Sequence, residues 1–173
     1  MSINARLQRL LDEVRTGYAV LPHREADSAQ QVAEATHVKG RSLAKVVVMR
    51  DIEGADFLVV VPADVAIDPR ALRLVTGRIG VQLEDEKELA RLFPDCEVGA
   101  MPPFGRLYHM DMFVDPCLLE DVDVFFQAGN HHEIVLMRTA EYMRIARPFE
   151  VRGCLHRAAH DEPAALAAEE NVL

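Results

Sequence analysis

One lysine stands inside an otherwise apolar run, and its type and place suggest chemistry. Lys45 follows Leu43 and Ala44 and precedes three valines, residues 46–48. An ammonium group is costly to bury unless it is paired, so a lysine in a buried strand often marks a ligand site. The alternative is a lysine near a strand end whose head group reaches water. The sequence leaves both interpretations open.

A second candidate is the stretch Gly99-Ala100-Met101-Pro102-Pro103-Phe104-Gly105. Glycine permits positive φ, whereas proline fixes φ and has no amide to donate, so this stretch is neither regular helix nor central strand. Its remaining backbone amides cannot all pair locally. A rigid loop with free amides suits a carbonyl or phosphate oxygen. A tight connector without a ligand is the simpler interpretation of the same composition.

The histidines are weaker candidates for acid–base or metal chemistry. His131 and His132 are adjacent, so on a strand their side chains point to opposite faces. His109 and Asp111 share a face, but two ligands do not make a metal site. A metal-dependent hydrolase built from these four residues is therefore a minority hypothesis, and we expect no metal and no cofactor. A loop histidine such as His23 suits acid–base chemistry or simple solvation.

The pattern of the chain predicts the elements that position these residues. Apolar spacing and capping residues predict helices over residues 4–15, 28–35, 69–75, 85–93 and 139–146. Gly17 is expected to end the first helix and Thr139 to cap the last. Apolar and β-branched runs predict strands over residues 18–21, 43–50, 57–61, 79–83, 107–114, 123–127 and 134–138.

Strands joined by hairpins or short crossovers and interleaved with helices predict an α/β fold of the α+β kind. We expect one domain over residues 1–150, with a mixed, mostly antiparallel twisted sheet or open barrel flanked by helices. Residues 151–173 are expected to form a peripheral C-terminal tail, either a short helix or a loose segment from Arg152 onward.

Composition narrows the class of protein. The 173 residues carry 19 Lys and Arg against 28 Asp and Glu, a net charge of −9, so any contact with nucleic acid must be local. The three cysteines are scattered, which argues against a disulfide framework and a zinc site. No apolar run is long enough to span a membrane, and the amphipathic N-terminus lacks an export signal. We expect a cytoplasmic protein.

Taken together, these pieces resemble the YbaK/proline-tRNA-synthetase-associated editing-domain family. The resemblance runs from Tyr18 to Arg147 and rests on four segments in the expected order. These are Pro22-His23 through Gln30, the lysine strand Ala44–Val48, the Gly-x-x-x-Pro loop within Phe93–Gly105, and the turn Ala128-Gly129-Asn130. The lysine strand and the Gly-x-x-x-Pro loop are specific in combination at this separation.

The resemblance implies a YbaK-like fold and a free-standing deacylase that hydrolyses mischarged aminoacyl-tRNA, with the tRNA acceptor end as its partner and an aminoacyl-tRNA synthetase as a second candidate partner. It implies that the loop backbone positions the ester carbonyl and a water, and that Lys45 contacts the terminal nucleotide or the aminoacyl group. Lys45 and Gly99 are thus the expected catalytic residues. The expected substrate-binding residues are His23, Met101, Pro102, Pro103, Phe104, Gly105, Ala128, Gly129, Asn130 and His131.

The chain departs from the family pattern in one turn. Some family members carry a serine where Ala128 stands, so their substrate does not carry over to this chain. Asn130 or His131 is a candidate for a replacement contact. The alternative function is a non-catalytic module of the same fold that binds aminoacyl-tRNA or a nucleotide.

Overall fold

A computed structural model describes residues 3–153 and 155–157 of the chain. The α-helices are α1 (Ala5–Glu13), α2 (Ala29–Thr36), α3 (Pro69–Thr76), α4 (Glu86–Leu92) and α5 (Thr139–Ala146). Short 3₁₀ helices span Gly40–Ser42, Gly105–Tyr108 and Pro116–Leu119. The strands are β1 (Tyr18–Pro22), β2 (Leu43–Arg50), β3 (Asp56–Pro62), β4 (Val65–Ile67), β5 (Gln82–Leu83), β6 (Asp111–Val114), β7 (Asp123–Gln127), β8 (Glu133–Arg138), β9 (Phe149–Glu150) and β10 (Leu155–Arg157).

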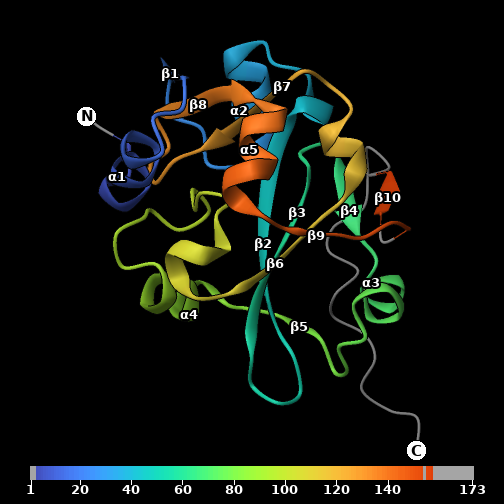
Figure 1. Cartoon of the computed structure of the whole chain (residues 1–173). Helices are drawn as coiled ribbons and strands as arrows, with labels where there is room; N and C mark the ends of the chain where they lie inside the picture. Colours follow the sequence, from blue (N-terminus) through green and yellow to red (C-terminus); the bar gives the residue numbers. More distant parts are fainter. Residues whose placement is uncertain (1–2, 154, 158–173) are drawn as a thin grey trace, which may run out of the picture.

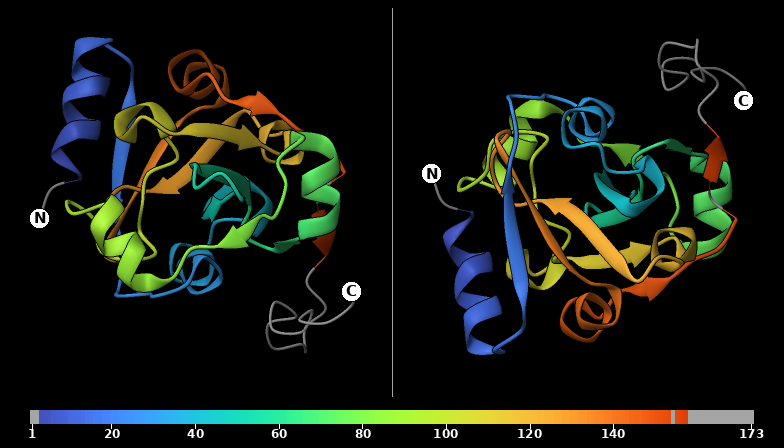
Figure 2. Two further views of the ribbon diagram at one scale, coloured as in Figure 1. Left: turned by 90° about the horizontal axis from the view of Figure 1, so that it is seen from below. Right: turned by 90° about the horizontal axis from the view of Figure 1, so that it is seen from above.

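Eight strands form one mixed sheet in the spatial order β1-β8-β7-β2-β3-β6-β9, with β5 paired to β2, while β10 and β4 form a separate ribbon. Three pairs are parallel, namely β2 with β7, β3 with β6 and β6 with β9. The long β2–β3 hairpin runs through the middle of Figure 1 with α5 in front of it. Helices α1 and α3 lie at opposite sides (Figure 2). The predicted fold class is confirmed.

The predicted helix starts are set by side chains that satisfy free backbone amides. The Ser28 hydroxyl accepts from the Gln31 amide, and Gln31 reaches back, which completes the capping box of α2. Asp68 accepts from the Arg70 amide, and Pro69 opens α3. These contacts are local in sequence, and both starts agree with the prediction.

The strand predicted over residues 107–114 is wrong in its first half. Residues 105–108 form a 3₁₀ turn, His109 takes a positive φ of 56°, and β6 begins only at Asp111. Glycine is required at position 105, because a Cβ there would lie 2.5 Å from the Met110 carbonyl oxygen. The chain therefore folds back on itself at a close approach that alternation of apolar residues does not reveal.

Three element ends also differ from the prediction. Helix α1 is capped at Val14, and the left-handed residue after it is Arg15 (φ 52°) rather than Gly17. Thr139 does not cap α5, because its hydroxyl donates to the Asp121 carbonyl at 2.7 Å. The strand expected over residues 79–83 is reduced to β5, since only Gln82 and Leu83 pair with β2.

The expected tail is partly a strand. Residues 155–157 form β10 and pair with β4, in place of the short helix or loose segment expected there. Residues 158–173 lie outside the described residues, so the boundary of the tail stays a prediction. Within the described part, no helix combines the length and the apolar character that a bilayer crossing requires.

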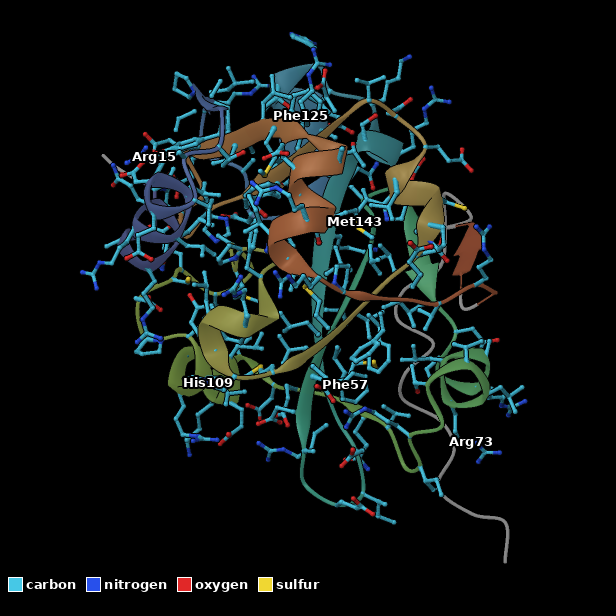
Figure 3. All side chains as sticks on the ribbon, viewed as in Figure 1. Arg15, Phe57, Arg73, His109, Phe125 and Met143 are labelled. Atoms are coloured by element: carbon cyan, nitrogen blue, oxygen red, sulfur yellow. The ribbon has the colours of Figure 1, made fainter. Side chains whose placement is uncertain are left out.

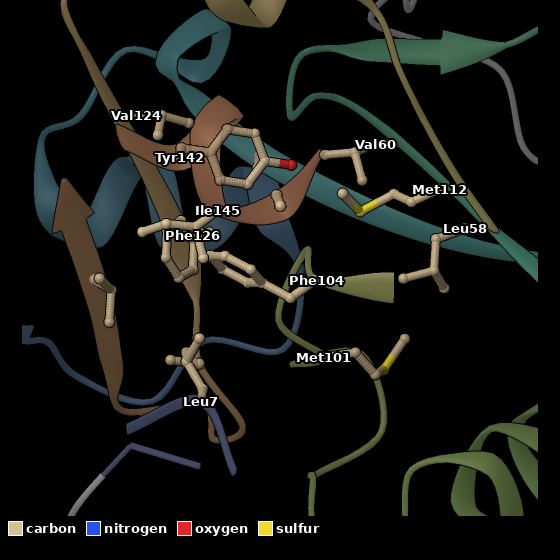
Figure 4. Packing of buried hydrophobic residues seen from close by; sticks show 14 of the residues in the cluster. Leu7, Leu58, Val60, Met101, Phe104, Met112, Val124, Phe126, Tyr142 and Ile145 are labelled. Carbon is tan, nitrogen blue, oxygen red and sulfur yellow. The ribbon is translucent and has the colours of Figure 1, made fainter. Parts of the chain in front are cut away.

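The main core packs α1 and α5 against the sheet, and side chains fill the space between these elements (Figure 3). At its centre the Phe104 ring lies 5.4 Å from Phe126 and 5.5 Å from Tyr142. Tyr142 is fully buried, and its hydroxyl has no hydrogen-bond partner among the described residues. The hydroxyl points toward Val60 and Met112 (Figure 4).

We expect Tyr142→Phe to raise the free energy of unfolding by about 1 kcal/mol, because a buried hydroxyl without a partner loses its hydration and gains nothing in return. Urea denaturation of both proteins measures the change. A Tyr108→Phe variant is the control, because the Tyr108 hydroxyl donates to Asp95 at 3.2 Å and its removal should destabilise. A Tyr142→Phe protein less stable than the parent would show that the hydroxyl is satisfied.

Candidate active site

A cleft of about 420 Å³ opens where β2 loses its neighbours along one edge. Its walls come from four places: β2 itself, the loop before α2, the stretch 99–105 (the Gly/Pro loop) with the end of β7, and β5 with α4. The lining residues are Asp27, Ser28, Ala29, Ala44, Lys45, Val46, Val47, Val48, Leu83, Glu84, Glu86, Leu89, Val98, Gly99, Met101 and Gln127. The two strongest sequence candidates, Lys45 and Gly99, therefore lie on one cleft.

Two amides of the Gly/Pro loop belong to residues that line the cleft and lack a strong acceptor. Ala100 donates to the Glu97 carbonyl at 3.0 Å, and Phe104 donates to the Pro102 carbonyl at 2.8 Å. The Gly99 amide faces only the Met101 thioether, a weak acceptor, at 3.2 Å. The Met101 amide has no acceptor among the described residues. The Gly105 amide also lacks an acceptor among the described residues, but Gly105 is buried and does not line the cleft, so Gly99 and Met101 are the two candidate donors there.

Gly99 holds a conformation that favours glycine, with φ at +91°. A Cβ added there would meet only ordinary contacts, 3.6 Å from His131 and 3.8 Å from the Asp27 carbonyl oxygen. The requirement for glycine is therefore one of backbone angle rather than of space.

Lys45 is half-buried rather than solvated. Side chains alternate along β2, so the Lys45 side chain lies on the same face as Val47 and Met49. Val46 lies on the opposite face and packs against the core cluster that contains Met101. Its ammonium donates to the Val65 carbonyl oxygen of β4. Burial lowers the pKa of the Lys45 ammonium, and the Asp64 carboxylate acts in the opposite direction. Lys45 lines the cleft together with the loop, while its ammonium is bonded on the β4 side of the strand.

The turn after β7, residues 128–131, is hydrogen-bonded to the Gly/Pro loop and to the segment before it. The Gly129 amide donates to the Ala100 carbonyl at 2.8 Å, and its carbonyl accepts from the Glu97 amide at 2.9 Å. The Glu97 carboxylate in turn accepts from the His131 amide at 2.6 Å. Gly129 has φ +108°, and a Cβ there would lie 2.9 Å from Asn4, so the turn depends on glycine. These contacts give the turn a supporting role.

The His131 ring ties two cleft walls together. Its Nε2 atom lies 2.9 Å from the Val98 carbonyl oxygen, and its Nδ1 atom lies 3.1 Å from the Ala26 carbonyl oxygen. The Gln127 side-chain nitrogen also lies 3.4 Å from the Nδ1 atom. Val98 directly precedes the Gly/Pro loop, and Ala26 belongs to the loop before α2. The ring therefore fixes the spacing between these loops.

The other residues expected to bind substrate do not line the cleft. Ala128 is fully buried, and the Asn130 side chain is used within its own turn, where it contacts Glu133 and the His132 amide. His23 is held by a backbone contact to His132, and its ring Nδ1 lies 2.7 Å from the Arg24 carbonyl oxygen. Within the Gly/Pro loop, four residues are buried and do not line the cleft, namely Pro102, Pro103, Phe104 and Gly105.

Several cleft residues carry no signal in the sequence. Gln127 is 6% exposed and contributes a buried amide to the wall. Glu84 pairs with Arg50 at 2.8 Å, whereas the carboxylates of Asp27 and Glu86 have no ion pair among the described residues. Asp27 gave no signal, because its place in a cleft depends on which loops meet in space.

No described side chain is set up as a covalent nucleophile in this cleft. The Ser28 hydroxyl accepts from the Gln31 amide, and no described histidine or carboxylate hydrogen-bonds to it. Cys96 lies outside the cleft beside Tyr108, and burial raises the pKa of its thiol to about 11. Among residues 3–153 and 155–157, no three His, Cys, Asp or Glu side chains gather as metal ligands.

A second cavity of about 490 Å³ lies at the C-terminal end of α3, and Asp111 is the one residue considered in the sequence analysis that lines it. Two of its three carboxylates are already paired, because Arg78 pairs with Asp51 and Asp111 and lies over the Phe57 ring at 4.5 Å. The cleft beside β2, with free amides and unpaired carboxylates, is the stronger candidate for a site.

Comparison with known proteins agrees with this choice. The sequence profile of the aminoacyl-tRNA editing domain matches residues 23–145, which include Lys45, the Gly/Pro loop and the turn after β7. The Escherichia coli K12 protein named multifunctional Ser/Thr-tRNA deacylase ProXp-y is 30% identical over 151 residues, which covers 83% of this chain and 87% of that protein.

Two solved structures share the fold. A protein described as a candidate trans-editing enzyme for prolyl-tRNA synthetase superposes with a TM-score of 0.74 at 18% identity, covering 91% of this chain and 99% of that one. The hypothetical protein APE2540 superposes with a TM-score of 0.75 at 18% identity, covering 84% of this chain and 98% of that one. On the extent of the profile match and the identity to the E. coli deacylase, this chain belongs to the aminoacyl-tRNA editing domain family.

Proposed function

We propose that the chain is an aminoacyl-tRNA deacylase that hydrolyses the ester bond of mischarged tRNA in trans. The observation that carries the proposal is the single cleft lined by Lys45, Gly99 and Met101, in a chain of the editing family. The partner is the acceptor end of tRNA, with an aminoacyl-tRNA synthetase as a further partner. The compartment we propose is the cytoplasm, where tRNA is charged and used.

The chemistry requires little from side chains, because an aminoacyl ester is already activated. The Gly99 and Met101 amides are suited to donate to the ester carbonyl oxygen and to stabilise the charge that develops on it. A water attacks the carbonyl carbon, the ester bond to the ribose breaks, and the ribose hydroxyl leaves with a proton. Lys45 holds the substrate in place, and the neighbouring tRNA hydroxyl assists.

We propose seryl and threonyl esters as the first substrates, because the E. coli relative is named for these two. The buried Gln127 amide in the cleft wall supports a polar aminoacyl group, since its nitrogen contacts the His131 ring at 3.4 Å and its oxygen can accept from a hydroxyl. The Asp27 and Glu86 carboxylates are complementary to the α-ammonium that every aminoacyl ester carries.

The test is the release of labelled amino acid from a panel of tRNAs charged with serine, threonine, alanine, cysteine and proline. We expect seryl and threonyl esters to be hydrolysed at least about 100-fold faster than in buffer, the scale of one oxyanion donor. Gln127→Leu should reduce discrimination for these two esters about tenfold, since the side chain would lose a hydrogen bond of about 1.4 kcal/mol.

A folded protein that hydrolyses no member of the panel would contradict the proposal. If that protein still bound a non-hydrolysable seryl-adenosine amide, the non-catalytic binding module would replace the deacylase as its function. Equal rates on all five esters would contradict the assignment of serine and threonine and leave the deacylase in place.

A further inference from the structure

We infer that the open edge of β2 binds the terminal adenine of the tRNA through the backbone N–H and C=O of Val46. This inference rests on the proposed function, because the aminoacyl ester of any charged tRNA sits on the ribose of its terminal adenosine. The base lies one ribose away from the ester carbonyl. A cleft that seats the carbonyl at Gly99 and Met101 therefore also has to seat the base.

The cleft exposes an edge of β2 rather than a face. Five consecutive residues of this strand, 44–48, line the cleft. Side chains alternate between the two faces of a strand, so one face could contribute only every second residue. Consecutive lining residues require that the backbone itself borders the space.

The register leaves this part of the edge without a strand partner. Pairing with β7 covers Leu43 and Ala44 and stops there. Pairing with β5 covers only Met49 and Arg50. Beyond these pairs, the Val48 carbonyl accepts from the Glu84 amide at 3.0 Å. Residues 45–47 therefore have no strand partner on the cleft side of β2.

Val46 is the residue whose backbone points into that gap. The Leu43 carbonyl accepts from the Ala63 amide at 2.9 Å, which shows that Leu43 bonds toward β3. Backbone groups alternate between the two edges of an antiparallel strand, so Lys45 and Val47 also bond toward β3. The N–H and C=O of Val46 point the other way. Among the described residues they have no strand partner.

A donor and an acceptor side by side on one extended residue match the Watson–Crick edge of adenine. Adenine N1 accepts, and the adjacent N6 amino group donates, so the Val46 N–H would bond to N1 and its C=O would accept from N6. Leu83, Leu89 and Met101 line the same cleft and supply apolar contacts for a planar ring. A backbone N–H or C=O that is removed from water without a partner raises the free energy of the complex, so a ligand that hydrogen-bonds to both groups gains affinity.

The charges of the cleft favour a neutral base over a phosphate at this place. Asp27, Glu84 and Glu86 bring carboxylates to the lining, and the single lining cation, Lys45, is engaged by the Val65 carbonyl. A phosphate on the edge of β2 would meet repulsion, whereas adenine carries no charge. The terminal base is therefore the part of the tRNA end that this edge fits.

Binding of non-hydrolysable 3′-serylamino-3′-deoxyadenosine analogues tests the inference by calorimetry. We expect the 1-deazaadenine analogue, which lacks the N1 acceptor, to bind about tenfold more weakly than the parent. The 7-deazaadenine analogue keeps N1 and N6 and is the matched control, with binding within twofold of the parent. Equal binding of the 1-deaza analogue and the parent, equal weakening by both changes, or no binding of the parent would overturn the inference.

Two proline variants test the direction of the backbone. Val46→Pro removes an N–H that faces the cleft, so the variant should fold and bind the parent analogue about tenfold more weakly. Val47→Pro removes an N–H that bonds to β3 and should be much less stable to urea. If the two variants were equally destabilised, the Val46 N–H would belong to the fold and not to the ligand.

These measurements separate the inference from the function on which it rests. A protein that hydrolyses seryl-tRNA but binds the parent and 1-deaza analogues equally keeps the deacylase function and loses the adenine subsite. A protein that discriminates the analogues as expected but releases no serine keeps the subsite and loses the deacylase function.

Discussion

Replacing Lys45 with alanine is expected to lower kcat/KM for the release of serine from tRNA by roughly 100-fold or more. Lys45 is the one cation that lines the cleft, and its ammonium is held at a fixed place by the Val65 carbonyl. An ammonium has three protons, so the bond to Val65 orders the group and leaves two protons for the substrate. The measurement is the initial rate of serine release at subsaturating tRNA.

The fold should tolerate this change. Burial lowers the pKa of the Lys45 ammonium, so the charged form is disfavoured in the folded protein, and its removal offsets the loss of the bond to Val65. Arg73→Ala is the matched control, since it removes a cation from α3 at the outer edge of the molecule (Figure 3) and should leave the rate within twofold. A folded Lys45→Ala protein with the parental rate would remove Lys45 from the proposed mechanism.

The second large effect is expected for Gly99→Ala, which should lower kcat/KM by about 100-fold and the free energy of unfolding by about 1–2 kcal/mol. The added methyl group fits, because its nearest neighbour would be the His131 ring at 3.6 Å. The strain comes from φ at +91°, which alanine relieves by rotating the backbone. That rotation turns the Gly99 amide away from the ester carbonyl.

Gly54→Ala separates strain from catalysis. Gly54 lies in the β2–β3 hairpin turn with φ at +83°, and a Cβ there would meet nothing within 4 Å. The two alanine variants should therefore lose similar stability in urea, while only Gly99→Ala loses deacylation. Equal activity in the two variants would show that the Gly99 amide is not a donor to the substrate.

Local chemistry explains why much of the fold was predictable. The capping box of α2 and the Asp68-Pro69 start of α3 involve residues within four positions of each other, so the sequence contains both partners. The valine-rich strand 43–50 was also predictable, because a strand buried on both faces has no polar alternation. Gly105 was not, since its need for glycine comes from the Met110 carbonyl after a turn.

The candidate site likewise contains residues that the sequence indicated and residues that only the tertiary structure placed there. Lys45 and Gly99 stood out as single residues, a lysine in an apolar strand and a glycine in a stiff loop, and both lie on the cleft. Asn130 and His131 were expected on the rim, but their contacts lie within the turn and between the loops. Gln127 gave no signal, because a glutamine at the end of a strand is ordinary until a cleft opens beside it.

The sequence by itself determined the fold class, the lysine strand, the Gly-x-x-x-Pro loop and the family to which they belong. Only the tertiary structure decided that β7 and β5 diverge along β2 and leave residues 45–47 on an open edge. The reason is physical: a capping box or a buried strand is set by neighbours in sequence, whereas a gap between strands depends on pairings between segments more than 30 residues apart.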